Sequence, residues 1–247
     1  MNVWHDINPK RITPQDFLAI IEISKGSKNK YELDKESGIL ILDRILYTST
    51  HYPANYGFIP KTLADDGDPL DVLVLCNEPI NPMVLVQCYP IGVITMVDNG
   101  KNDEKIIAIP FEDPTFNSYR SIEALPQHIF QEMQHFFTVY KQLENKCTAV
   151  NEVMGQKAAV EVIAQCIENY QKKYGTEKAA EKRTEAEKAV EKGTAKAAEK
   201  ASSKTAEKKT AKTATESTAK TEKSAAKTEK PTAKKTAAKK ASKGTNK

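Results

Sequence analysis

Four carboxylates crowd into a short stretch directly ahead of an apolar run. The stretch reads Asp65-Asp66-Gly67-Asp68-Pro69-Leu70-Asp71, and the residues from Val72 to Cys76 have the composition of a buried strand. Two like charges ~4 Å apart repel by roughly 4 kcal/mol at an effective dielectric constant of about 20. A fold that holds this cluster at a strand end therefore needs raised carboxyl pKa values or a bound cation.

The residue types in this stretch favour Mg²⁺ as that cation. Gly67 allows a tight turn and Pro69 fixes φ, so the loop is stiff as well as rich in oxygen ligands. An Asp-rich solvated turn is the alternative that applies to any single Asp-x-Asp. A calcium-binding helix-loop-helix is excluded, because the twelfth residue counted from Asp66 is Asn77 rather than Glu, and a strand follows.

A predicted hairpin offers a second set of charged side chains. Residues 30–34 alternate with period two, Glu36-Ser37-Gly38 is a turn, and residues 39–46 form the return strand. The hairpin carries Lys30, Glu32 and Arg44, a mixture that suits a polyanion together with a metal. Ion pairing between the two strands is the alternative role for the same residues.

Two loops have composition that allows more than one role. The loop from His51 to Pro60 carries Tyr52 and Tyr56, which either plug the end of a barrel or place a phenol donor beside an anion. The polar turn from Asp98 to Lys105 contains a strong hairpin signal and two more aspartates. It either faces the first acidic stretch across a metal site or is an ordinary solvated turn.

The hydrophobic pattern predicts short strands followed by two helices, a mainly β arrangement of the α+β class. The lack of strand–helix alternation excludes a doubly wound sheet. Glu22 interrupts an apolar strand, where a lone acid is usually an edge residue facing solvent. The predicted strands lie at 17–23, 30–34, 39–46, 72–76, 83–98 and 106–109, and the predicted helices at 125–144 and 156–174.

Charge and composition divide the chain near Gly175. Residues 1–175 hold 16 Lys and Arg and 23 Asp and Glu, a net charge of −7, whereas residues 176–247 have a net charge of +11. No aromatic residue follows Tyr174. A Lys/Ala/Thr/Glu-rich segment without aromatics cannot bury enough surface to offset chain entropy. The sequence therefore predicts one folded domain at residues 1–175, which is long enough to form a single hydrophobic core, and a low-complexity, disordered basic tail at residues 176–247.

The chain shows no targeting or membrane signal. Its first residues are polar, and no apolar run approaches the ~20 residues of a membrane span. The four histidines are scattered and the four cysteines lack paired spacing, which argues against a zinc site. Free buried thiols are expected at Cys76 and Cys88, and the expected location is the cytoplasm.

Taken together, these motifs resemble the soluble inorganic pyrophosphatases of the single-domain barrel type, closest to the bacterial ones. The stretch Asp66 to Val72 matches the family signature at every restricted position, and the resemblance covers residues 3–172. One departure is Val153-Met154, where many relatives carry Gly-Trp, and the tail lies outside the family pattern. The other matching positions are Glu22, Lys30-Tyr31-Glu32, Asp43-Arg44, Tyr52 to Gly57, Asp98, Asp103-Glu104-Lys105 and Tyr140-Lys141.

The resemblance implies a five-stranded, closed, OB-like barrel with two C-terminal helices. It also implies a homohexamer and Mg²⁺-dependent hydrolysis of pyrophosphate to two phosphates by metal-activated water. Asp68 resembles the general base. The implied metal positions are Asp66, Asp71, Asp103 and Asp98, assisted through water by Glu22 and Glu32, and the implied substrate-binding positions are Lys30, Arg44, Tyr56, Tyr140, Lys141 and Lys105.

A binding module is the alternative to an enzyme. An OB-like barrel for nucleic acid should expose aromatic and basic side chains along its strands, whereas the expected site face here is rich in aspartate. The tail is a separate matter, since residues 201–247 carry a net charge of +10. Such a chain binds polyanions by releasing counterions, so non-specific nucleic-acid binding is expected of the tail, with added solubility as the alternative.

Overall fold

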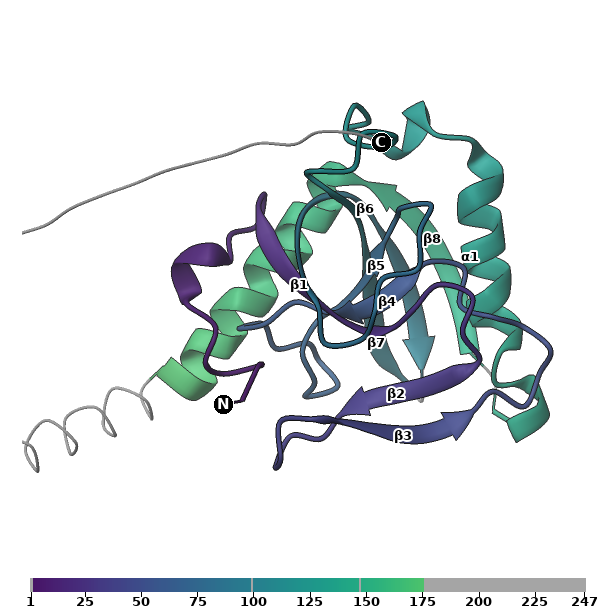
Figure 1. The fold of residues 1–247 in the computed structure, drawn as a ribbon, viewed down its shortest axis with the longest axis horizontal. Coiled ribbons are helices and arrows are strands. Elements are labelled where there is room, and N and C mark those ends of the chain that lie inside the picture. Colours follow the sequence, from purple (N-terminus) through teal and green to yellow (C-terminus); the bar gives the residue numbers. More distant parts are fainter. Residues whose placement is uncertain (1, 99, 147, 176–247) are drawn as a thin grey trace, which may run out of the picture. The chain divides into compact units, whose positions relative to one another are not determined.

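The computed structural model describes residues 2–98, 100–146 and 148–175, so the predicted tail lies outside the described residues (Figure 1). These residues form a mainly β structure with two helical segments. The strands are β1 (Phe17–Ile23), β2 (Asn29–Leu33), β3 (Leu40–Ile45), β4 (Asn55–Phe58), β5 (Asp71–Val74), β6 (Leu85–Asp98), β7 (Lys101–Pro110) and β8 (Thr148–Gly155). The helices are η1 (Pro9–Arg11), η2 (Ile122–Ala124), α1 (Gln127–Val139), η3 (Gln142–Glu144) and residues 156–175.

Five strands are linked by pairings that return to their starting point. The sheet order is β1-β4-β5-β7-β6-β8, and β1 also pairs with β6. The pairing of β5 with β7 is parallel, whereas the other pairings in this sheet are antiparallel. Strands β2 and β3 form a separate two-stranded sheet, the β2–β3 hairpin. The parallel pair matters most for the site, because it places the start of β5 beside the middle of β7.

Alternation along β5 and β7 divides the interior into two cores. Leu73 and Ile107 belong to a cluster with Phe130 and Phe137 of α1. The intervening residues of the same strands pack instead with the helical segment 156–175. Each helical segment therefore covers a different core, as the ribbon shows (Figure 1). No helix among the described residues combines the length and the apolar composition needed to cross a membrane.

The two ends of the described chain are tied together by aromatic residues. Trp4 is 2% exposed and donates from its indole Nε1 to the carbonyl of Thr62 at 2.9 Å. The neighbouring ring of His5 has Nδ1 2.7 Å from the hydroxyl of Tyr170. The hydroxyl of Thr62 in turn accepts from the backbone N–H of Leu70 at 2.8 Å. The N-terminal segment therefore braces the loop that leads into the acidic stretch.

The structure differs from the sequence-based expectations in several elements. Strand β4 lies inside the predicted aromatic loop, and β7 begins at Lys101, inside the predicted polar turn. Strand β8 was not predicted, and it lies between the two expected helices. The predicted helix 125–144 is shorter, because Pro126 stands at the N-cap of α1 and the chain breaks into η3 near its end. Asn145 then takes a left-handed conformation, with φ of 57°. These breaks place Tyr140 and Lys141 in a bend rather than inside a helix.

The described cysteines are free thiols in two kinds of surroundings. Cys88 and Cys166 are buried, and burial raises the pKa of both thiols well above the ordinary value. Cys76 is only partly buried, so the expectation of a buried thiol there was wrong. Its sulfur accepts from the side-chain nitrogen of Asn55 at 3.1 Å.

Candidate active site

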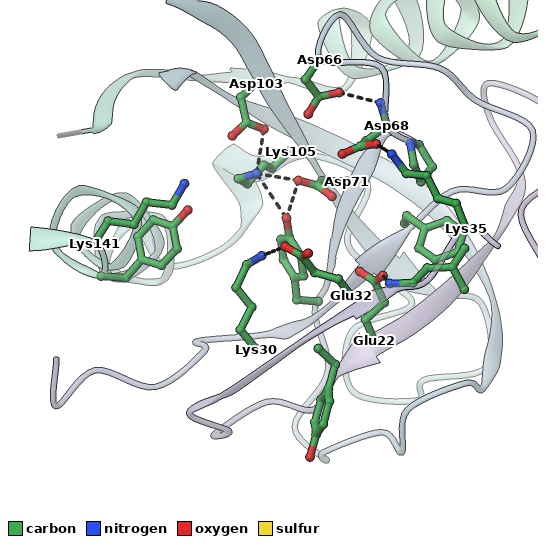
Figure 2. Close-up of a pocket in the computed structure, with 16 residues that line it drawn as sticks. Glu22, Lys30, Glu32, Lys35, Asp66, Asp68, Asp71, Asp103, Lys105 and Lys141 are labelled. Carbon is green, nitrogen blue, oxygen red and sulfur yellow. Dashed lines mark hydrogen bonds and ion pairs between the residues drawn. The ribbon is translucent and has the colours of Figure 1, made fainter. Parts of the chain in front are cut away.

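A cavity of about 300 Å³ lies where the acidic turn, β5, β7 and the β2–β3 hairpin meet (Figure 2). Most of the residues predicted to form a site line it. Arg44 does not, and the side chain of Asp98 lies outside the described part of the structure. The predicted residues that line the cavity are Glu22, Lys30, Glu32, Tyr56, Asp66, Asp68, Asp71, Asp103, Lys105, Tyr140 and Lys141.

The acidic turn owes its shape to backbone hydrogen bonds. The N–H of Ala64 donates to the carbonyl of Asp68 at 2.8 Å, and Gly67 has φ of +94°. A side chain at Gly67 would be strained, so glycine is required at this position. The N–H of Asp68 donates to Oδ1 of Asp66 at 2.9 Å. The turn thus holds two carboxylates at the cavity wall, and burial raises the pKa of Asp66.

Strand register brings the next carboxylates together. Asp71 of β5 pairs directly with Lys105 of β7, and Asp103 precedes Lys105 by two residues, so it shares the same face. The ammonium of Lys105 lies 2.6 Å from Asp71 Oδ2 and 2.8 Å from Asp103 Oδ1. This face continues the apolar surface of Leu73 and Ile107 into the cavity.

Burial and ion pairing act in opposite directions on this group. For Lys105, burial alone lowers the pKa, but Asp71 and Asp103 raise it well above its usual value. For Asp71, burial raises the pKa although Lys105 opposes the change. Because 26% of the Asp71 side chain remains exposed and Lys105 is buried between two acceptors, we take the charged pair as the resting state.

The two tyrosines of the aromatic loop have different roles in the structure. Tyr56 donates its hydroxyl to Oδ2 of Asp71, and burial raises its pKa well above the usual value, so the phenol is a neutral donor. Its oxygen also lies 3.3 Å from the ammonium of Lys105. Tyr52 does not line the cavity but packs its ring 4.8 Å from that of Phe136. The loop therefore supplies one donor and one apolar plug.

Glu22 is not the solvent-facing edge residue expected from its apolar surroundings. It is 7% exposed, and its Oε1 accepts from the backbone N–H of Leu33 at 2.9 Å. Burial, with a smaller contribution from Asp71, raises the pKa of Glu22 to about 8. Both sides of β1 are covered, which the apolar pattern alone did not reveal. Glu22 thus joins β1 to β2 beneath the cavity.

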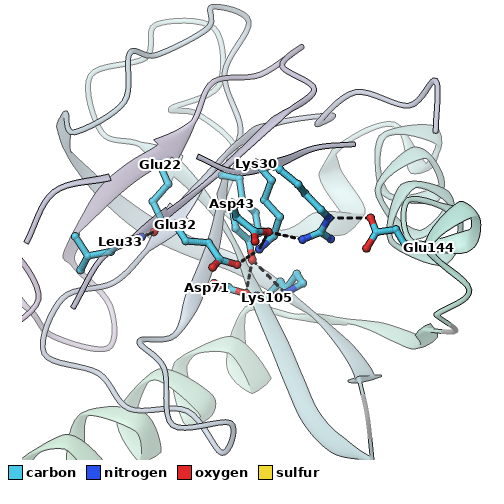
Figure 3. A network of polar contacts seen from close by, with 10 residues as sticks. Glu22, Lys30, Glu32, Leu33, Asp43, Asp71, Lys105 and Glu144 are labelled. Carbon is cyan, nitrogen blue, oxygen red and sulfur yellow. Dashed lines mark hydrogen bonds and ion pairs between the residues drawn. The ribbon is translucent and has the colours of Figure 1, made fainter. Parts of the chain in front are cut away.

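The charged residues of the β2–β3 hairpin pair with one another as well as lining the cavity (Figure 3). Lys30 contacts Glu32 and lies 3.4 Å from Asp43 across the strands. Arg44 donates from Nε to Oε1 of Glu144 at 2.8 Å and contacts Asp43. Burial alone would raise the pKa of the Asp43 carboxyl, but the nearby charges of Lys30 and Arg44 lower it. Arg44 is thereby held against η3 rather than inside the cavity.

Lys35 lines the cavity although it was not predicted to belong to the site. Its ammonium contacts Oδ1 of Asp68, the residue expected to act as the base (Figure 2). The sequence placed Lys35 only in a polar hairpin turn, where lysine is common. Nothing in the local pattern pointed to the acidic turn, because the two residues are 33 positions apart.

The carboxylates fit a hard divalent cation in their chemistry. Among the described residues, no three carboxylates already stand close enough to form a complete metal site. Asp71 and Asp103 nonetheless converge on one cation, the ammonium of Lys105. With Asp66 they form a set of oxygen donors, the type that Mg²⁺ prefers. The chemistry of these donors thus fits a hard divalent cation.

Comparison with known proteins gives a consistent result over the described domain. The profile of the inorganic pyrophosphatase family matches residues 19–171. Soluble inorganic pyrophosphatase 2 of Chlamydomonas reinhardtii is 46% identical over 171 residues, 69% of this chain and 89% of the relative. The inorganic pyrophosphatase of Aquifex pyrophilus is 46% identical over 172 residues, covering 68% and 97%. The crystal structure of inorganic pyrophosphatase from Thermus thermophilus superposes with a TM-score of 0.66 and 38% identity, covering 69% of this chain and 99% of that one. The chain belongs to the inorganic pyrophosphatase family.

Proposed function

We propose that the protein hydrolyses inorganic pyrophosphate to two orthophosphates. The observation that carries the proposal is the convergence of carboxylates and lysines on one cavity in a chain of this family. Phosphoryl transfer requires positioning and neutralisation of charge more than covalent help from the protein. A cavity with both signs of charge meets that requirement.

Substrate binding falls to the cationic wall of the cavity. Lys30 and Lys141 stand on different elements, so their ammonium groups approach the cavity from the hairpin and from the bend after α1. Tyr140 adds a phenol donor for phosphate oxygens, and Tyr56 would add a second if its hydroxyl turned away from Asp71. Arg44 is a further candidate, and it must leave Glu144 or bind through another nitrogen to reach the substrate.

Asp68 is the proposed general base. It is half exposed at the cavity mouth, so its carboxylate can hold an attacking water and accept its proton. Asp66, Asp71 and Asp103 would hold the first Mg²⁺, with Asp98, Glu22 and Glu32 assisting further ions. Bound Mg²⁺ would supply a water of lowered pKa and neutralise the charge of the phosphates. The acidic wall otherwise repels a bare pyrophosphate anion.

Family membership also supports a proposal for the architecture and the assembly. We propose that the five-strand ring is a closed OB-like barrel, since β1 pairs with both β4 and β6. We also propose a homohexamer located in the cytoplasm. Light scattering coupled to gel filtration tests the assembly, because a hexamer of 27.5 kDa chains differs clearly from a monomer or dimer.

A second function is proposed for the tail alone. Residues 201–247 carry a net charge of +10 and no aromatic residue, which favours non-specific binding of nucleic acid through counterion release. The site residues all precede or include Lys141, so this binding is expected to be separate from catalysis.

The deciding experiment is phosphate release from pyrophosphate. The purified full chain should release phosphate at neutral pH with Mg²⁺ and stop when the metal is chelated. Ca²⁺ should support the reaction poorly, because it is larger and more loosely coordinated. Full activity in excess chelator, or no activity with Mg²⁺, would contradict the proposal.

A further inference from the structure

The tip of the β2–β3 hairpin reaches across the cavity mouth to the acidic turn. There the ammonium of Lys35 contacts Oδ1 of Asp68, and both side chains are about half exposed, at 52% and 50%. The same ammonium lies 5.8 Å from the centre of the Trp4 ring. Lys35 thus reaches the acidic turn from a different element, the β2–β3 hairpin.

The backbone of Lys35 is fixed by two neighbours. The carbonyl of Lys35 accepts from Nδ2 of Asn2 at 3.0 Å. One residue earlier, the side chain of Asp34 accepts from the N–H of Ser37 at 3.0 Å, and its carbonyl accepts from the N–H of Gly38 at 2.8 Å. The hairpin turn and the N-terminal segment therefore hold Lys35 in place, so its contact with Asp68 does not rest on a loose tip.

The position of this contact distinguishes Asp68 from its neighbours. Asp66 uses Oδ1 to accept the N–H of Asp68, and Asp71 and Asp103 converge on Lys105 deeper in the cavity. Oδ1 of Asp68 instead contacts the ammonium of Lys35 at the mouth of the cavity. Lys105 balances only one of the two negative charges of Asp71 and Asp103, so that pair keeps a net negative charge that attracts a metal ion, whereas Lys35 balances the charge of Asp68 completely.

We propose that Lys35 is a positioning residue that keeps Asp68 out of the metal shell. By pairing with Oδ1, it reserves Asp68 for the water and leaves metal binding to Asp66, Asp71 and Asp103. This inference rests on the proposed function, because it takes Asp68 as the base. Four aspartates line the same cavity, and a cation from another element decides which of them stays free of metal.

The test is a double-mutant cycle between Lys35 and Asp68, read by calorimetric titration of Mg²⁺ without substrate. Lys35→Met should bind Mg²⁺ about threefold to fivefold more tightly, the size of an exposed ion-pair coupling, because Asp68 joins the metal shell. Its kcat should fall about tenfold, while KM changes little. Lys35→Arg should keep the wild-type affinity and rate.

The effect must pass through Asp68. In the Asp68→Asn background, Lys35→Met should leave the Mg²⁺ affinity unchanged. Lys172→Met is the matched control, since Lys172 forms an exposed ion pair with Glu168 on the C-terminal helical segment, away from the cavity. It should match wild type in both measurements.

Two outcomes would overturn the inference. One is an unchanged Mg²⁺ affinity in Lys35→Met. The other is an equal rise in affinity with and without Asp68, which would mean that removing a nearby positive charge acts on the metals directly. Failure of the proposed function looks different: the wild-type chain would then release no phosphate with Mg²⁺, whatever the calorimetric cycle shows. Failure of Asp68 as the base would appear as a wild-type kcat in Asp68→Asn.

Discussion

Asp68 and Asp71 lie three positions apart but in different surroundings, and their variants should differ accordingly. Asp71 is enclosed by Lys105 and Tyr56, whereas Asp68 is half exposed beside Lys35. Asp71→Asn should weaken Mg²⁺ binding and the rate together. Asp68→Asn should keep metal binding while lowering kcat by roughly 10²–10⁴, the range for a lost general base. Calorimetry and steady-state kinetics check both, and equal loss of metal would refute the assignment of Asp68.

Glu22 should make the metal-free protein less stable as pH rises. Its folded pKa of about 8 lies above the ordinary 4.5, so only the folded state keeps the proton between these values. The free energy of unfolding therefore falls as pH rises from about 4.5 to about 8, and this contribution is constant outside that range. Urea unfolding in chelator should show wild type losing stability from pH 5 to pH 8 relative to Glu22→Gln.

In that comparison the glutamine keeps an acceptor for the N–H of Leu33 without a titratable proton. Parallel stability curves for the two proteins would show that Glu22 does not titrate as its burial suggests.

At the level of strands, Gly57 controls how closely β1 and β4 approach. A Cβ on Gly57 would lie 1.8 Å from the carbonyl oxygen of Ile20, which no adjustment of a side chain can relieve. Gly57→Ala should therefore separate the strands, lower stability by about 2 kcal/mol or more, and reduce kcat by displacing Tyr56. Thermal melting and phosphate release measure the two effects.

The control for this substitution is Gly175→Ala. A Cβ there meets nothing within 4 Å, so stability and rate should stay near wild type. An unchanged melting temperature in Gly57→Ala would mean that the strand ring tolerates a wider β1–β4 spacing than its geometry implies.

The sequence predicted those elements whose apolar residues alternate or repeat strongly. Strand β1 occupies the predicted range, and the acidic turn, β5 and the hairpin were placed correctly. Strand β8 was missed because none of its eight residues is fully buried, so it lacks a clear apolar face. Its place in the sheet comes from pairing with β6, a long-range contact that local pattern does not contain.

Most residues that line the cavity were predicted from their match to the family pattern. The gathering of Asp71, Asp103 and Lys105 follows from the parallel register of β5 and β7, which no single motif encodes. Lys35 was not predicted, because its partner Asp68 lies on another element. Arg44 was expected to bind the substrate. Its guanidinium instead donates to Glu144 of η3, 100 positions later in the sequence, a contact that the local pattern does not contain.

For the whole molecule, the prediction concerns the separation of tail and catalysis. Truncation after Tyr174 should preserve the fold and kcat, because the family match ends at residue 171 and the cavity-lining residues all precede the tail. It should abolish retention on duplex DNA at low salt. Retention of the full chain should fall steeply as salt rises, since counterion release drives it.

Gel-shift titration of both proteins at several salt concentrations measures this difference. DNA binding by the truncated protein, or none by the full chain at low salt, would refute the role proposed for the tail. A loss of kcat on truncation would refute its independence from the active site.

The contact between Trp4 and the ring of Tyr170 has a consequence for synthesis on the ribosome. This aromatic contact cannot form until Tyr170, more than 160 residues downstream of Trp4, has been made, so the joining of the two ends waits for the end of the domain. At least 72 residues then follow Gly175, which take about 4–14 s at roughly 5–20 residues per second. The domain therefore has seconds to join its two ends while the nascent chain is still tethered.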